Sequence, residues 1–135
     1  QPVFQAGVTL AFHDANSATP PDGSPFSTFK FTTDWTYAEE CGISGRLLTL
    51  PSLHPDHNPD VTMVMARYHR GGFLAPHRHD RVETIHIISG SYVDTVTGQM
   101  YSDGETQSVL PHQLHSQKSD ECVILATWRP AYPAV

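Results

Sequence analysis

Residues 71–90 read GGFLAPHRHDRVETIHIISG, and this stretch decides how the rest of the chain is interpreted. His77 and His79 are two residues apart, so on an extended strand their side chains leave the same face. Glu83 keeps the same parity and joins them if the strand continues through it. Two imidazoles and a carboxylate converging on one point are donors that a divalent transition metal prefers. The stretch therefore predicts a metal site, which one further ligand would complete.

The best candidate for that further ligand is His115, in the segment LPHQLHS. The alternative is that these are ordinary polar residues on strands, which an H-x-H pair alone would favour. The chain has nine histidines in 135 residues, and four of them lie at positions 77, 79, 112 and 115. This clustering favours a metal site.

The same stretch resembles the first motif of the cupin superfamily, G-x5-H-x-H-x3,4-E-x6-G, at every defined position. The second cupin motif, G-x5-P-x-G-x2-H-x3-N, is kept only at Gly104 and His115. Three of its positions depart from the pattern: Leu110, His112 and Ser119. The first motif therefore carries the resemblance, and the second supports the His115 ligand alone.

The resemblance covers roughly residues 44–129 and implies an all-β fold, a single-domain cupin jelly-roll β-barrel. Within one domain, residues 1–43 would form an N-terminal arm and edge strands, and residues 44–135 the barrel. The ending SDECVILATWRP resembles the ChrR-like cupins, which include the metal-binding half of an anti-sigma factor and small dioxygenases that cleave bonds beside a ketone. Small cupins are commonly dimers, so a homodimer is expected.

The pattern of short apolar runs with Gly and Pro between them also predicts a sandwich or barrel. The apolar run VTLAF near the N-terminus is an expected edge strand, and Thr97-Gly98 is a hairpin signal. The other expected strands are 29–35, 46–50, 61–69, 82–88, 91–96, 99–102, 106–110, 113–117 and 121–129. Residues 14–25 and 51–60 are predicted loops. No stretch of ten or more residues has a convincing helical period.

Composition limits the classes of function. With 39% hydrophobic and 16% charged residues the chain builds a core. A net charge of −6 with scattered Lys and Arg argues against nucleic acid as a partner. No run approaches the ~18 apolar residues of a membrane span. No signal peptide is visible, which favours a cytoplasmic protein. Because the chain begins at Gln1, loss of an upstream targeting segment is the alternative. Cys41 and Cys122 are expected to be reduced thiols; a disulfide between them is the alternative.

The resemblance implies one divalent transition metal, bound by His77, His79, Glu83 and His115. Fe(II) is favoured, and Mn(II), Ni(II), Co(II) or Zn(II) also suit three imidazoles and a carboxylate. Such a set leaves one or two positions of an octahedral ion open for water, dioxygen or a chelating substrate.

Three further roles follow for residues near the predicted site. Glu83 is a fourth ligand or, swung away, a base. His112 is a base or proton shuttle, or else an exposed turn residue. Arg67 and Tyr68 fall on opposite faces of their strand: an inward Arg67 would bind a carboxylate or enolate, whereas an outward one is a surface arginine.

The predicted function is a small metal-dependent cupin enzyme, a non-haem Fe(II)-type dioxygenase acting on a small oxygenated, enolisable compound. Ile85 and Ile87 share the face of Glu83, so the interior suits an aromatic or aliphatic substrate better than a sugar. One alternative is a non-redox lyase, isomerase or cyclase; another is a metal-binding sensor or ligand-binding module without catalysis. The absence of a Gly-rich phosphate loop and of GxSxG leaves nucleotide and serine-hydrolase functions unsupported.

Overall fold

The computed structural model describes residues 8–14, 27–49 and 61–129, and for residues 8–14 and 27–31 it describes the backbone alone. This part of the chain is all-β and contains no helix. Its strands are β1 (Val8–Asp14), β2 (Ser27–Phe31), β3 (Thr36–Ala38), β4 (Ile43–Leu47), β5 (Thr62–Tyr68), β6 (Gly72–Arg78), β7 (Val82–Val93), β8 (Met100–Ser102), β9 (Thr106–Val109), β10 (His115–Ser119) and β11 (Cys122–Arg129).

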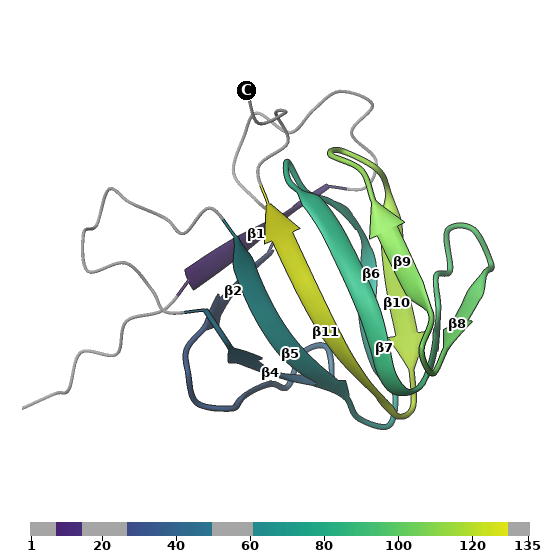
Figure 1. Ribbon diagram of the computed structural model, residues 1–135, viewed down its shortest axis with the longest axis horizontal. Helices are drawn as coiled ribbons and strands as arrows, with labels where there is room; N and C mark the ends of the chain where they lie inside the picture. Colours follow the sequence, from purple (N-terminus) through teal and green to yellow (C-terminus); the bar gives the residue numbers. More distant parts are fainter. Residues whose placement is uncertain (1–7, 15–26, 50–60, 130–135) are drawn as a thin grey trace, which may run out of the picture.

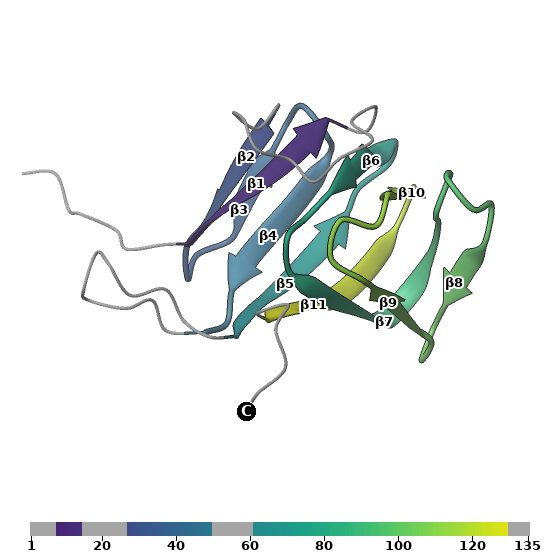
Figure 2. The ribbon, with the colours of Figure 1, turned by 90° about the horizontal axis from the view of Figure 1, so that it is seen from above.

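The strands form one antiparallel sheet in the order β2-β1-β6-β10-β7-β11-β5-β4-β3, and β8 and β9 both pair with β7. The sheet curls into a half-barrel, as Figures 1 and 2 show. Because of this curl β2 and β4, which are far apart in the order of the sheet, approach each other (Figure 2). The predicted all-β cupin fold class is confirmed.

The core lies on the concave face of the curl, where alternate residues of β5, β7 and β11 meet. Its buried hydrophobic side chains are Leu47, Val64, Ala66, Tyr68, Ile85, Ile87, Tyr92, Val109, Cys122, Ile124, Ala126 and Trp128. Burying such side chains is the main favourable term in folding. The predicted inward face of β7, with Glu83, Ile85 and Ile87, is confirmed.

Most predicted strands form within one to three residues of their expected bounds. The expected strand 29–35 is wrong at its end, because β2 stops at Phe31 and the chain bends before β3, leaving Trp35 49% exposed. The Thr97-Gly98 turn does join β7 to β8, with Ser91 opposite Ser102. The two predicted loops lie almost entirely outside the described residues.

Three further features bear on the expectations from sequence. β4 runs across the predicted boundary at residues 43 and 44, which stays a prediction. Cys41 and Cys122 are free thiols, half-buried and buried respectively. Among the described residues no helix is long and apolar enough to cross a membrane.

Candidate metal centre

The pairing of β6 with β10 places His77 directly opposite His115. His77 lies near the end of β6, and His115 opens β10. The two imidazole rings are 4.1 Å apart between centroids, and both side chains are fully buried. The ligand that sequence analysis predicted from the second motif is therefore in contact with the first motif.

A β-bulge in β6 makes this contact possible. Gln117 lies opposite Leu74 and His115 opposite His77, so three residue steps on β6 match two on β10. Strict alternation would turn Leu74 and His77 to opposite faces, whereas the extra residue turns both inward. The extra step includes Pro76, and a residue without an N–H is tolerated at such an irregularity.

His79 and Glu83 reach the site from a turn and a second strand. The condition that one strand continues through Glu83 is not met, because β6 ends at Arg78 and Glu83 lies in the separate strand β7 that begins at Val82. The backbone N–H of His112 donates to the carbonyl of His79 at 2.6 Å. Arg78 in turn donates to the carbonyl of His112 at 2.6 Å. These bonds fasten the turn that carries His79 to the loop preceding β10.

The three histidines form one compact cluster. One ring nitrogen from each of His77, His79 and His115 lies within 4.8 Å of the other two. One carboxylate oxygen of Glu83 is 3.7 Å from His79 Nε2 and 3.4 Å from His115 Nε2. All four side chains are at least nine-tenths buried. The three histidines thus form one cluster, and Glu83 lies beside two of them, His79 and His115.

Burial determines the protonation of the cluster. It lowers the pKa of His77 to about 4, and it lowers the pKa of His115 well below the ordinary value, with the neighbouring His77 and His79 acting in the same direction. Burial also raises the pKa of Glu83 to about 8, partly opposed by Trp128. His77 Nδ1 donates its proton to the carbonyl of Ala75 at 2.6 Å, so Nε2 carries the lone pair. Neutral imidazoles are the form that binds metals.

The polar atoms of the cluster fit a divalent cation. Both ring nitrogens of His115 and one carboxylate oxygen of Glu83 are buried and make no hydrogen bond with any described residue. Buried polar atoms without partners are costly and need an explanation. A metal ion in the cluster would provide it for one ring nitrogen of His115 and for the Glu83 oxygen, since nitrogen and oxygen atoms are its usual protein ligands.

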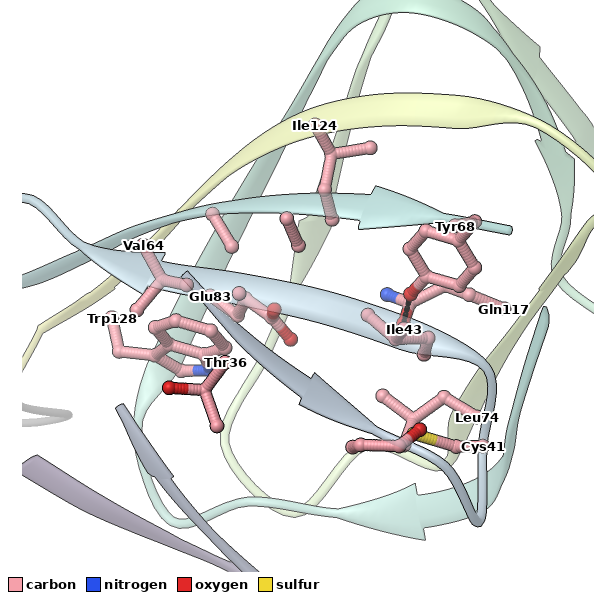
Figure 3. Close-up of a pocket in the computed structure, with 14 residues that line it drawn as sticks. Thr36, Cys41, Ile43, Val64, Tyr68, Leu74, Glu83, Gln117, Ile124 and Trp128 are labelled. Atoms are coloured by element: carbon pink, nitrogen blue, oxygen red, sulfur yellow. Dashed lines mark hydrogen bonds between the residues drawn. The ribbon is translucent and has the colours of Figure 1, made fainter. Parts of the chain in front are cut away.

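A mainly apolar pocket borders the cluster at Glu83 and encloses about 600 Å³ of space, its solvent-filled mouth included. Trp128 lies beside Glu83 in the wall, and Tyr68 and Gln117 lie together away from Trp128 (Figure 3). The other lining residues are Thr36, Ala38, Cys41, Ile43, Gly45, Val64, Ala66, Leu74, Ile124 and Ala126. Glu83 is therefore shared by the histidine cluster and the wall of the pocket.

Arg67 does not reach the pocket. Tyr68 takes the inward position on β5 at 2% exposure, so the alternation of the strand turns Arg67 outward. The Arg67 side chain is 54% exposed and lies 3.8 Å from the Glu121 carboxylate. Arg67 is therefore a surface arginine, and the prediction that it points inward and binds a carboxylate is wrong.

His112 occupies the loop next to the cluster. Its backbone adopts a left-handed conformation with φ 63°, where the second cupin motif has glycine. Its side chain is half-buried, and its backbone contacts both His79 and Arg78. This placement supports the turn of His79, and the proton-shuttle role of His112 stays a prediction.

Sequence analysis did not single out Gln117 as a pocket residue. The available signal was its position two residues after His115, which places both side chains on one face of a strand. Both are buried, at 1% and 0% exposure.

No family model matches this chain, and no curated protein matches it either. Solved structures do. An RmlC-like cupin from Shewanella frigidimarina is 19% identical, with a TM-score of 0.61 over 73% of this chain and 85% of that one. The polyketide cyclase RemF from Streptomyces resistomycificus is 18% identical, with a TM-score of 0.57 over 76% and 82% of the two chains.

The anti-sigma ChrR, in its complex with SigE from Rhodobacter sphaeroides, is 14% identical with a TM-score of 0.56. The match covers 70% of this chain but only 47% of ChrR. At these identities the similarity establishes the fold alone. The chain has the cupin fold, and its three clustered histidines offer nitrogen donors close enough together to hold one metal ion.

Proposed function

We propose that this protein is a metal-dependent enzyme acting on a small, mainly apolar compound that binds the metal through oxygen. The observation that carries the proposal is the position of Glu83. Its carboxyl group approaches His79 and His115 to within 3.7 and 3.4 Å, and it also lines the pocket. A compound in the pocket therefore lies next to both a metal site and a titratable group.

The cofactor of the proposal is one divalent transition metal bound by the three histidines and Glu83, with Fe(II) favoured. Three neutral imidazoles and one carboxylate suit first-row ions, and the absence of a cysteine ligand speaks against a structural zinc site. When bound, such an ion would polarise substrate oxygens and, as iron, would supply electrons for dioxygen chemistry.

The reaction class of the proposal is dioxygenation of an enolisable compound. When it is swung away from the metal, Glu83 would accept the proton that leaves the carbon beside a carbonyl group, because it is the only carboxyl group among the described residues that line the pocket. The apolar walls, with Trp128 and Ile124, would exclude water around the resulting enolate. The same walls would select an aromatic or aliphatic substrate.

A non-redox lyase, isomerase or cyclase is the second candidate. Proton transfer by Glu83 beside a Lewis acid is sufficient for these reactions, and the similarly folded RemF is a cyclase. A sensor or binding module without catalysis is the third. The open pocket beside Glu83 favours an enzyme over a site that holds a metal for structure alone.

The test begins with the metal content of protein purified without metal-affinity resin. We expect about one transition metal per chain. The iron-loaded protein is then mixed with a panel of 1,3-diketones and α-hydroxyketones, aerobically and anaerobically, while dioxygen and substrate are followed. Substrate loss matched by dioxygen uptake supports the dioxygenase, and equal loss without dioxygen supports the non-redox enzyme. Protein without metal, or metal-loaded protein that turns over none of the panel, contradicts the proposal.

A further inference from the structure

Gln117 presents a polar group inside the apolar pocket. Its side chain is 1% exposed and leaves β10 on the same face as His115. The hydroxyl of Tyr68 donates a hydrogen bond to Gln117 Oε1 at 2.7 Å, and both residues line the pocket (Figure 3). Because this hydroxyl donates to the amide oxygen, the orientation of the Gln117 amide is set by Tyr68.

The other end of the Gln117 amide has no partner in the described part of the chain. Nε2 is buried and makes no hydrogen bond with any described residue. An amide nitrogen carries two protons, and leaving such a donor unpaired out of water is costly. The nitrogen nevertheless lies in a pocket wall whose other side chains are mostly apolar, where a bound molecule is the available acceptor.

A second tyrosine–glutamine pair in the same core shows the completed arrangement. The hydroxyl of Tyr92 donates to Gln107 Oε1, and Gln107 Nε2 donates to Asp94 Oδ2 at 2.9 Å. Asp94 is fully buried and provides the acceptor that Gln117 lacks. The first pair borders the pocket and the second does not, so the missing acceptor coincides with the space for a ligand.

We propose that the Gln117 amide, oriented by Tyr68, is a specificity donor for a second oxygen of the substrate. The inference rests on the proposed function, because that proposal places the first oxygen of the substrate at the metal centre. The second oxygen would accept a hydrogen bond from Nε2 and complete the arrangement that Asp94 completes for Gln107.

The chemistry of the wall defines the class of that oxygen. None of the described lining residues is Lys or Arg, so a carboxylate or phosphate would find no opposite charge. A neutral acceptor such as a ketone oxygen meets the requirement. His115 and Gln117 occupy alternate positions of β10, so the two oxygens of the substrate belong to separate positions of the molecule, as in a ring substituted at both ends.

The test compares two phenols of nearly equal shape. In both compounds the phenol hydroxyl group is the oxygen that would bind at the metal centre. 4-Hydroxyacetophenone carries a ketone oxygen at the far end, and 4-ethylphenol carries none. Binding of both to the zinc-loaded protein and to the metal-free protein is measured by calorimetry. We expect about tenfold tighter binding of the ketone, as one hydrogen bond to a buried donor predicts.

Two variants assign the preference to the amide. Gln117→Leu keeps the approximate volume and should bind the two phenols within about twofold of each other, with 4-ethylphenol bound at least as tightly as by the wild type. Tyr68→Phe removes the group that orients the amide and should reduce the preference. In the wild type, the ¹⁵N–¹H signals of the Gln117 side-chain amide should shift with the ketone and remain in place with 4-ethylphenol, a readout that requires no variant to fold.

The inference would be overturned if the wild-type protein bound the two phenols equally or bound neither. It would also be overturned if the Gln117 amide signal did not move with the ketone, or if the Gln117→Leu protein retained the preference for the ketone. The binding measurement on metal-free protein distinguishes failure of this inference from failure of the proposed function. A ketone preference that persists without zinc assigns the contact to Gln117, whereas a protein that binds no metal at all removes the proposed enzyme and leaves the amide contact standing.

Discussion

Glu83 is the residue at which the metal cluster and the pocket meet, and its environment gives it an unusual pKa. Burial raises that pKa to about 8, so the carboxyl group of the folded, metal-free chain is protonated at neutral pH. A bound cation would favour the charged form instead. Glu83 is therefore the residue through which pH and metal binding are coupled.

The first prediction concerns the stability of metal-free protein between pH 6.5 and 8. A carboxyl group whose folded pKa lies above its unfolded value contributes stability below the unfolded pKa and loses it as pH rises through the folded one. With Glu83 at about 8, stability should fall across this window, on the order of 1–2 kcal/mol. His77 and His115, whose pKa values burial lowers, are neutral in the folded state but about half protonated in the unfolded state at pH 6.5. Each therefore adds an opposing rise of roughly 0.4 kcal/mol over this window, which leaves a net fall of about 1 kcal/mol. Denaturant unfolding with a chelator present measures the effect.

Glu83→Gln is the matched control for that measurement, because the amide is close in size and does not titrate. Its stability should not fall across the same pH window, and should rise by somewhat less than 1 kcal/mol as His77 and His115 lose their protons in the unfolded state. A wild-type protein whose metal-free stability rises from pH 6.5 to 8 would contradict the assigned pKa of Glu83.

The second prediction concerns the histidine ligands. His77→Ala removes one of three clustered nitrogen donors and should lower the metal content of the purified protein to near zero. His86→Ala is the control, because His86 is exposed on the outer face, where its side chain bonds to Thr106. It should keep the wild-type content. Equal metal stoichiometry in the two variants, measured by elemental analysis, would show that the metal lies elsewhere.

At the scale of the element, β7 and β11 are held together where the chain turns sharply at Gly90. Gly90 has φ 83°, and a Cβ atom there would collide with the backbone oxygen of Glu121 and lie 3.0 Å from Cys122 Cα. The register between β7 and β11 shifts next to this contact, between Val123 and Ile124. Close approach of two backbones therefore requires glycine at this position.

The third prediction compares Gly90→Ala with Gly98→Ala. Gly98 has φ 80°, nearly the same backbone strain, but open space around a Cβ atom. We expect Gly98→Ala to lower the free energy of unfolding by about 1 kcal/mol, and Gly90→Ala by about 3 kcal/mol or more, because only the second adds a backbone collision. Urea unfolding of both variants measures the difference. Equal losses would mean that β11 moves aside at little cost.

At the scale of the whole molecule, the metal site joins parts of the fold that are distant in sequence. Its four side chains come from β6, the turn after it, β7 and β10. A ligand bound by the native arrangement alone stabilises the folded state by mass action. The cluster should therefore act as a cross-link of the half-barrel when an ion is present.

The fourth prediction is a dependence of thermal stability on metal concentration. Free metal at 100 times its dissociation constant should add about 2.7 kcal/mol to the free energy of unfolding and raise the melting temperature by several degrees. Calorimetric scans of chelator-treated protein at increasing metal concentration measure the rise. His77→Ala should show none, and a comparable rise in that variant would indicate binding outside the cluster.

Local patterns in the sequence determined much of this protein. The two-residue spacing of His77 and His79 predicted a metal site, and glycine and proline between short apolar runs predicted an all-β fold. Alternation also required Arg67 and Tyr68 to point to opposite faces. These properties depend on strand periodicity, which neighbouring residues fix among themselves.

Periodicity alone does not tell which face of β5 points to the interior. Only the tertiary structure decided this, and it placed Tyr68 in the pocket and Arg67 in solvent. The bulge in β6 and the turn after Arg78 depend on pairing with β10 and on hydrogen bonds from the loop of His112. Pairing between distant strands sets which residues face one another, so the contact of His115 with His77, and of Gln117 with Tyr68, arises only when the sheet closes.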